Sequence, residues 1–203
     1  ANVRLPLILL AFAFPRVPVL VAAHAVNLVS WAFWMPAVWD HMCWTALLEL
    51  TFVLSALAYR NEQRVAAAFL PAARAQLVVL YTSAAFWKLT TSWFDQRSSC
   101  ATILMSELLS SPLFPPLGDL RRFYAFMLDA APALVAALEF AVPAGLFFVP
   151  RFGILLALVF HQTINLMPMT YAGGFSIAMC SRLHVFACGV LSAGLTPSAD
   201  AFA

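Results

Sequence analysis

Long apolar stretches follow one another along this chain, and few charges fall inside them. The run 17–38 contains no Asp, Glu, Lys or Arg, and the run 123–149 contains only Asp129 and Glu139. A helix of about 20 apolar residues is long enough to cross the hydrocarbon core of a bilayer. Because 64% of the 203 residues are hydrophobic and only 10% are charged, such runs fill most of the chain. The sequence therefore predicts an all-α, polytopic integral membrane protein.

We expect a single transmembrane domain over residues 1–203, with no soluble domain. A spanning segment must satisfy its backbone hydrogen bonds internally, so the spans are expected to form one helical bundle. At roughly 20 residues per span, the chain has room for about five to seven spans. The expected spans cover residues 17–38, 42–59, 75–93, 123–149, 152–171 and 175–195, with a half-length apolar segment at 5–14 and an interfacial or re-entrant helix at 98–109.

Prolines mark the expected breaks, because proline removes one helical hydrogen bond and kinks or ends a helix. The span that begins at residue 75 is expected to be separate from the Ala-rich segment 65–74 before it. The expected breaks are at Pro71, Pro132 and Pro143, with a tight turn at Pro150-Arg151.

Charge and cysteine content exclude several classes of protein. The formal net charge of +2 is too small to indicate a nucleic-acid partner. The four cysteines form no C-x-x-C pair, so no metal site is expected from them. They are expected to pack as small hydrophobic side chains, and a disulfide between loop cysteines stays open. The partner that composition indicates is membrane lipid.

Lys88 is the only lysine of the chain, and it stands near the end of an apolar run. A cation there is costly unless it reaches the interface, pairs or takes part in chemistry. Lys88 is therefore either an interfacial anchor or a reagent, because a buried lysine can act as a base where arginine cannot. One face of a helix over 75–93 would be polar at both ends and small in the middle, with Tyr81, Ala84, Ala85, Lys88, Thr91 and Ser92 along it.

Glu139 and His161 are two further polar residues within expected spans. A carboxylate in the middle of a span must pair or be protonated, and the expected partners of Glu139 are Arg151, Arg182 or a histidine. His161 and Asn165 are four residues apart and would share one helical face. Such a face serves either a hydrogen bond between helices or a binding site.

Three groups of residues together resemble a known family. They are Tyr81…Ala84…Lys88-Leu89…Trp93, then Phe160-His161…Asn165…Gly174-Phe175-Ser176-Ile177…Met179, and Glu139…Pro143 followed by Arg151. In order and spacing they are similar to the motifs of the HTTM (horizontally transferred transmembrane) family, which includes the vitamin K-dependent gamma-carboxylase. The resemblance is strongest over residues 81–183.

The resemblance implies a specific chemistry. In the carboxylase the lysine at the position of Lys88 is the base that deprotonates a reduced, vitamin K-like quinone. Reaction of the quinol with O2 then leads to carboxylation. The resemblance makes Lys88 the catalytic candidate, with a quinone-binding set of Tyr81, Trp93, Glu139, His161 and Asn165.

The sequence also departs from the family pattern. Ala85 stands where the family has glycine, and Trp87 where the carboxylase has a second lysine. Thr90 and Ser92 replace acidic residues, and Gln96 replaces a glycine. The lumenal domain that binds protein substrates has no counterpart in these 203 residues, so peptide carboxylation is not expected.

Two functions of different classes follow. The first is a quinol-dependent oxidoreductase or carboxylase-type (lyase) core. The alternative is a catalytically inert membrane subunit of a larger energy-transducing or photosynthetic complex, which binds lipid, quinone or pigment beside other membrane subunits. A transporter is a third possibility, suggested by proline-broken spans and buried charges. Pigment ligation would use histidines, of which the chain has His24, His41, His161 and His184.

Overall fold

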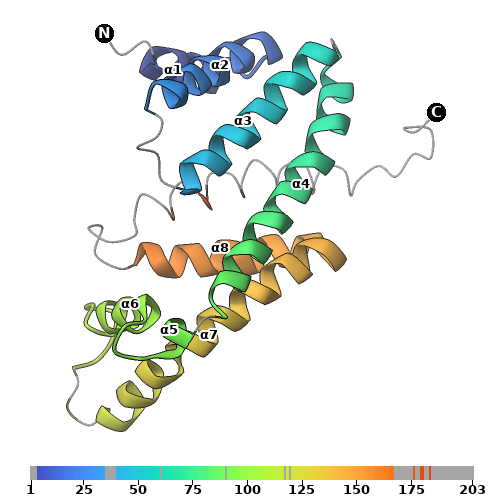
Figure 1. The fold of residues 1–203 in the computed structure, drawn as a ribbon. Helices are drawn as coiled ribbons and strands as arrows, with labels where there is room; N and C mark the ends of the chain where they lie inside the picture. Colours follow the sequence, from blue (N-terminus) through green and yellow to red (C-terminus); the bar gives the residue numbers. More distant parts are fainter. Residues whose placement is uncertain are drawn as a thin grey trace. The chain divides into compact units, whose positions relative to one another are not determined.

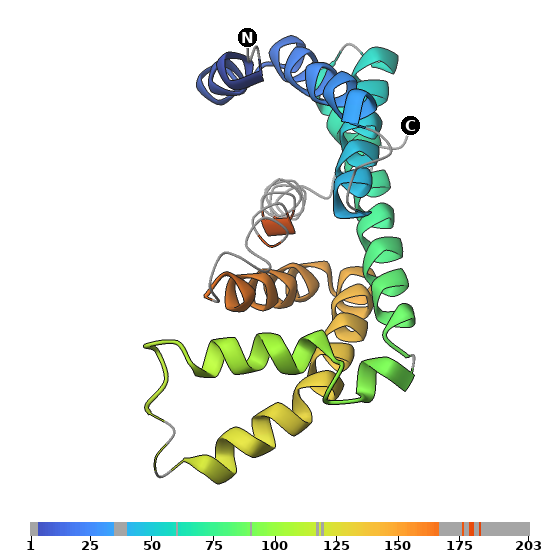
Figure 2. The same cartoon turned by 60° about the vertical axis from the view of Figure 1, so that its left-hand side comes forward.

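The computed structural model describes residues 4–34, 40–59, 61–89, 91–116, 118, 120–166, 176, 179, 180 and 183. All regular secondary structure in these residues is helical, in agreement with the predicted all-α class (Figures 1 and 2). The chain divides into two compact units, Ala1–Gln76 and Leu77–Ala203, and the boundary falls inside one continuous helix.

The first unit begins with three helices, α1 (Arg4–Ala13), α2 (Val17–Trp34) and α3 (Asp40–Ala58). Helix α2 packs against both α1 and α3. The chain reverses between α1 and α2 within three residues that include Pro15. These helices agree with the apolar segments predicted at 5–14, 17–38 and 42–59, apart from residues 35–38, which lie outside the described part.

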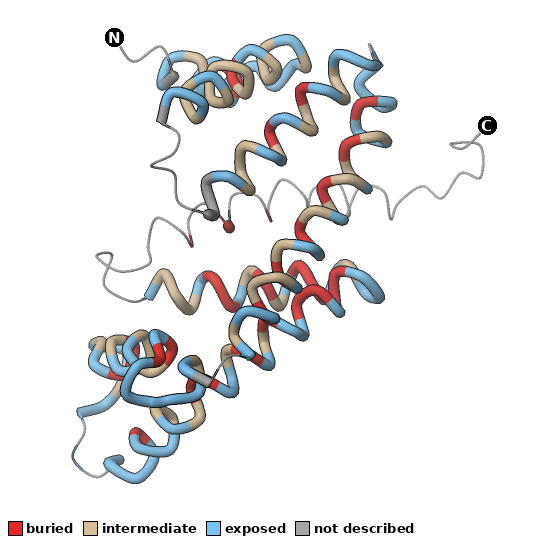
Figure 3. Tube along the Cα trace, viewed as in Figure 1, coloured by how far each residue is buried: buried red, intermediate tan, exposed pale blue. Residues whose placement is uncertain are grey.

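Helix α4 (Glu62–Trp87) begins earlier than predicted. The side-chain oxygen of Asn61 accepts the amide of Gln63 at 2.8 Å, which is the geometry of a helix N-cap. The predicted break at Pro71 is wrong, because Pro71 lies inside this helix. Every fourth residue along α4 is buried, on both sides of the proline (Figure 3). The buried stripe consists of Val65, Phe69, Ala73, Leu77, Tyr81 and Ala85.

Helix α4 also ends earlier than predicted, at Trp87. The amides of Lys88 and Leu89 bond to carbonyls three residues back, at 3.1 and 3.0 Å, which tightens the last turn. A separate short helix, α5 (Thr91–Phe94), follows. The prediction of one helix through residue 93 is therefore wrong, and Thr91 and Ser92 do not continue the face of Tyr81.

The second unit is completed by α6 (Cys100–Leu109), α7 (Arg121–Phe148) and α8 (Pro150–Asn165). Both α6 and α8 pack against α7, and Figure 2 shows them extending to the same side of it. Pro132 and Pro143 lie inside α7 without interrupting it, which corrects the predicted breaks. Neighbouring helices commonly allow proline inside a membrane helix. The tight turn is at Val149, because Pro150 is already the first residue of α8.

Two glycines let α7 and α8 cross closely. A Cβ atom on Gly153 would lie 2.2 Å from the amide nitrogen of Leu146, and one on Gly145 would lie 2.8 Å from the Cα of Gly153. Small residues allow this approach of one backbone to another. Both helices are rich in buried residues, among them Ala136, Val142, Pro143, Leu146, Ile154 and Ala157 (Figure 3).

Two helices, α4 and α7, are long and apolar enough to cross a membrane, with 26 and 28 residues. Helices α2, α3 and α8 have 18, 19 and 16 residues. Helix α8 ends at Asn165, and residues 167–171 of its predicted span lie outside the described residues. Most of the predicted span 175–195 also lies outside them. Four residues of it are described, each helical and buried: Ser176, Met179, Cys180 and Leu183.

Replacing Gly153 by alanine is expected to destabilise the α7–α8 crossing. The added methyl group meets backbone atoms that cannot move without shifting a helix, and such overpacking costs about 1–3 kcal/mol. The measurement is the thermal unfolding midpoint in detergent. Gly118→Ala is the matched control, because nothing lies within 4 Å of a Cβ atom there. Equal midpoints for the two variants would contradict the close crossing.

Candidate functional site

Lys88 and Glu139 form an ion pair inside the second unit. The Lys88 Nζ atom lies 2.5 Å from Glu139 Oε2, and the two side chains are only 19% and 11% exposed. Lys88 lies in the turn after α4, and Glu139 lies in the middle of α7. The predicted partner of Glu139 was Arg151, Arg182 or a histidine. Within the described residues this prediction is wrong, because the cation that contacts Glu139 is Lys88. Arg151 is exposed, and Arg182 lies outside the described part.

Trp93 is the third member of this group. The Lys88 Nζ atom lies 4.9 Å from the centroid of the Trp93 ring, which is within the range of a cation–π contact. The indole nitrogen donates a hydrogen bond to the carbonyl of Pro132 at 2.9 Å. This bond holds α5 against α7, so the aromatic face and the carboxylate contact the same ammonium group.

Lys88, Trp93 and Glu139 line a cavity of about 400 Å³. Ligand pockets in proteins commonly have volumes of about 300–1,000 Å³. Of the described residues that line it, only Lys88, Glu139 and Cys100 are ionisable, and most of the others are aliphatic or aromatic. The walls come from the end of α4, from α5 and from α6, α7 and α8: Ala84, Ala101, Leu104, Met105, Leu108, Leu134, Val135, Leu138, Leu156, Val159, Phe160, Thr163 and Ile164.

Tyr81 and His161 form a second pair, between α4 and α8. The Tyr81 hydroxyl and His161 Nε2 are 2.8 Å apart and share a hydrogen bond. The two residues are 3% and 0% exposed. Their neighbours Ala84 and Phe160 line the cavity, so this hydrogen bond connects two of the cavity walls.

Asn165 is placed differently from the other predicted site residues. Its side-chain nitrogen lies 3.3 Å from Gln162 Oε1 and 4.0 Å from Cys180 Sγ. It is not among the described residues that line the cavity. The structure therefore brings Lys88, Trp93 and Glu139 together at one cavity and places Tyr81 and His161 beside it. Asn165 lies at the C-terminal end of α8.

The wall formed by α6 was not predicted, because this segment was interpreted as interfacial or re-entrant. Its lining residues follow a helical spacing that was already visible in the sequence: Cys100, Ala101, Leu104, Met105 and Leu108. Cys100 is an exposed residue, but its position in the cavity wall desolvates the thiol enough to raise its pKa, and the positive charge of Lys88 acts in the opposite direction. Cys100 is thus a chemical reporter on the charge inside the cavity.

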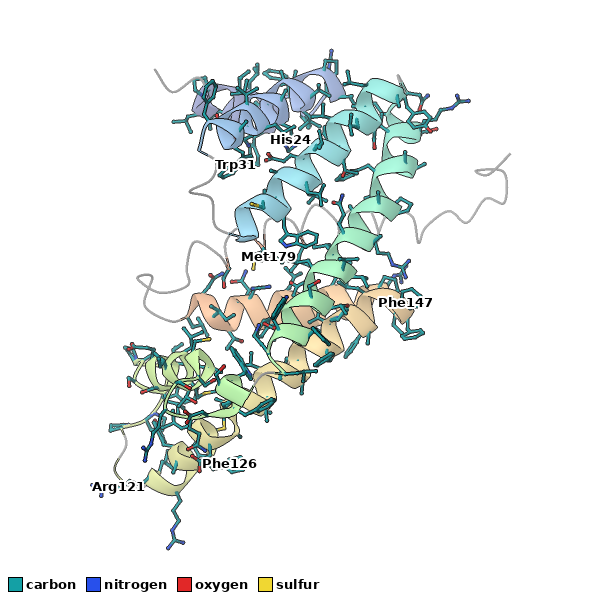
Figure 4. The ribbon with its side chains drawn as sticks, in the orientation of Figure 1. His24, Trp31, Arg121, Phe126, Phe147 and Met179 are labelled. Atoms are coloured by element: carbon teal, nitrogen blue, oxygen red, sulfur yellow. The ribbon has the colours of Figure 1, made fainter. Side chains whose placement is uncertain are left out.

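A separate polar cluster surrounds Glu49 in the first unit. Glu49 is 9% exposed, and it accepts hydrogen bonds from the side chains of Asn27 at 3.0 Å and Trp31 at 3.1 Å. The Nδ1 atom of His24 lies 3.6 Å from the same carboxylate. The three partners share one face of α2, and the labelled His24 and Trp31 are visible in Figure 4. Glu49 lies within the predicted span 42–59, but its partners on α2 were not predicted.

Within the described residues no group of three or more His, Cys, Asp or Glu side chains could hold a metal ion. Comparisons of the chain with protein-family models, curated proteins and solved structures give no match. Support for a function therefore comes from the cavity and its ion pair.

Removing one member of the Lys88–Glu139 pair is expected to destabilise the second unit. Lys88→Met leaves a buried carboxylate without its cation, and breaking a buried pair in this way costs about 3–5 kcal/mol. Lys88→Met combined with Glu139→Leu removes both charges and should recover most of that loss. Thermal unfolding in detergent of the wild type, Lys88→Met, Glu139→Leu and the double variant measures the interaction energy between the two residues. Purely additive effects would show that the pair contributes no interaction energy.

The alkylation rate of Cys100 is expected to depend on Lys88. The thiolate is the reactive form, and Lys88 favours it by lowering the pKa of the thiol. Lys88→Met should therefore slow maleimide labelling at a given pH, in a protein whose other three cysteines are alanine. Arg97→Met is the control, because it removes an exposed cation three residues from Cys100. Equal slowing by both substitutions would contradict a specific effect of Lys88.

Proposed function

We propose that this chain is an HTTM-type integral membrane protein that binds a reduced quinone or a similar neutral hydroxyl compound in the cavity beside Lys88. The proposed activity is that of a quinol-dependent oxidoreductase or carboxylase-type core, in which the Lys88–Glu139 pair receives the proton of the hydroxyl group. The observation that carries the proposal is this ion pair in the wall of an otherwise apolar cavity.

The charges at the cavity favour a neutral occupant. A carboxylate or phosphate ligand would be repelled by Glu139, and a cationic ligand would be repelled by Lys88. A hydroxyl group can donate to the carboxylate and accept from the ammonium at the same time. The aliphatic walls would contact a ring or an isoprenoid chain, and a volume of about 400 Å³ suits a small ring system.

A membrane location is supported by the two long helices and by their surfaces. Helices α4 and α7 have the length and apolar composition of spans. Large apolar side chains are exposed along α7, where lipid would cover them: Phe123, Phe126, Phe140, Phe147 and Phe148. We propose that the remaining apolar helices complete a polytopic bundle of about five to seven spans.

The motif resemblance supports the same site. The residue that corresponds to the carboxylase base is Lys88, and its neighbours in the motifs include Trp93 and Glu139, which contact it. The resemblance favours a reduced, vitamin K-like quinone over other hydroxyl compounds.

Blocking the cavity is expected to remove the bound quinone. The wild-type protein, purified in mild detergent and extracted with organic solvent, should yield close to one quinone per chain. Leu104→Trp places a large ring in the cavity and should reduce this yield at least tenfold. Ile103→Trp is the matched control, because the neighbouring residue is 52% exposed and does not line the cavity. The proposal fails if both variants retain the wild-type quinone content.

The alternative function is an inert subunit that holds lipid, quinone or pigment within a larger membrane complex. The apolar walls favour it, since they would retain such a molecule without any chemistry. Pigment ligation by His161 is less favoured, because its Nε2 atom already bonds to Tyr81. Copurifying membrane subunits, with unchanged quinone turnover in Lys88→Met, would favour this alternative.

A further inference from the structure

We infer that Glu139 receives the proton of the bound hydroxyl compound, while Lys88 stays a cation and holds the resulting oxyanion. The inference rests on the proposed function and assigns separate roles to the two members of the Lys88–Glu139 pair. The motif resemblance alone would give the proton to Lys88.

The contacts of Lys88 are those that a cation makes. Its ammonium group contacts a carboxylate at 2.5 Å and faces an aromatic ring at 4.9 Å. An ammonium group has no lone pair with which to take a proton. In this arrangement the available acceptor is the carboxylate of Glu139.

No other ionisable group competes for this role among the described residues that line the cavity. Helix α6 contributes Cys100, α7 contributes Glu139, and α8 contributes only uncharged side chains. His161 lies beside the cavity and shares its Nε2 atom with the Tyr81 hydroxyl. Proton transfer is therefore confined to the ligand, Glu139 and Lys88.

The charge balance favours the same assignment. The O–H bond of the ligand breaks, the proton joins a carboxylate oxygen of Glu139, and the electron pair stays on the ligand oxygen. One ion pair, Lys88 with Glu139, is exchanged for another, Lys88 with the oxyanion. The apolar cavity gains no net charge and no additional pair of separated charges. Either would be costly in such surroundings. A fixed cation placed at a developing oxyanion is a common form of electrostatic stabilisation.

The test uses 4-nitrophenol, whose phenolate has its own visible absorption band. Occupancy of the cavity is measured independently, as protection of Cys100 from maleimide in the single-cysteine protein. Infrared difference spectra on binding report whether a protonated carboxylic acid forms. We expect protection, a phenolate band and a new carboxylic C=O stretch in the wild type.

Substituted proteins show which residue gives rise to each of these signals. Lys88→Arg keeps a cation that cannot act as a base, so all three signals are expected to persist. Glu139→Asp should shift the frequency of the new stretch, and Glu139→Gln should abolish it. Glu49→Gln is the control for a buried carboxylate elsewhere and should leave the stretch unchanged. Circular dichroism and thermal unfolding confirm that each variant is folded.

Three outcomes are informative in different ways. A phenolate band without a new C=O stretch, or loss of the phenolate in Lys88→Arg with Cys100 still protected, would overturn the inference and make Lys88 the base. A protected Cys100 with the probe still a neutral phenol would also overturn it, while leaving the proposed binding site intact. Absence of protection in every folded variant would refute the proposed function, and the inference with it.

Discussion

The contact between Lys88 and Glu139 is the interaction on which the second unit depends. Each charge alone would lose several kcal/mol of hydration in apolar surroundings, so neither is stable there without the other. The contact requires α4 to end at Trp87, because only then does Lys88 leave the helix and meet α7. The Trp93–Pro132 hydrogen bond holds the following turn in place. The end of one helix and the middle of another are thus joined by a single buried pair.

The first unit meets the same physical requirement in a different way. Glu49 is also buried, but two of its contacts are hydrogen bonds from neutral donors, Asn27 and Trp31. Neutral donors satisfy a carboxylate without changing their own protonation, which suits a contact that holds α2 against α3. Glu49 also lies outside the cavity that Lys88 and Glu139 line. This difference in partners and surroundings is why we assign the chemistry to the second unit and a structural role to Glu49.

Local signals in the sequence predicted most of the helical segments and two cavity residues, because a charge within an apolar run is unusual wherever the chain folds. Lys88 and Glu139 were found in this way, whereas Trp93 was named only through the motif resemblance. Their mutual contacts were not predicted, since the angle at which the end of α4 meets α7 depends on tertiary packing. The prolines misled for a related reason: a local rule predicts a break at Pro71, but the helix and its buried stripe continue on both sides of it. Asn165 had the expected helical spacing, but spacing alone did not place it at the cavity.

The cavity itself follows from how α7 and α8 are joined. Gly145 and Gly153 bring the two backbones into contact close to the one-residue connection at Val149. Two helices that touch at one point and cross at an angle move apart with distance from that point. Each residue advances about 1.5 Å along its own helix axis. The lining residues of α7 and α8 begin several residues beyond the crossing, where the gap has opened, and α6 closes it as a further wall. On α7, Glu139 is the lining residue nearest to Gly145 in sequence, so the tight crossing also helps to set the position of this carboxylate in the cavity wall.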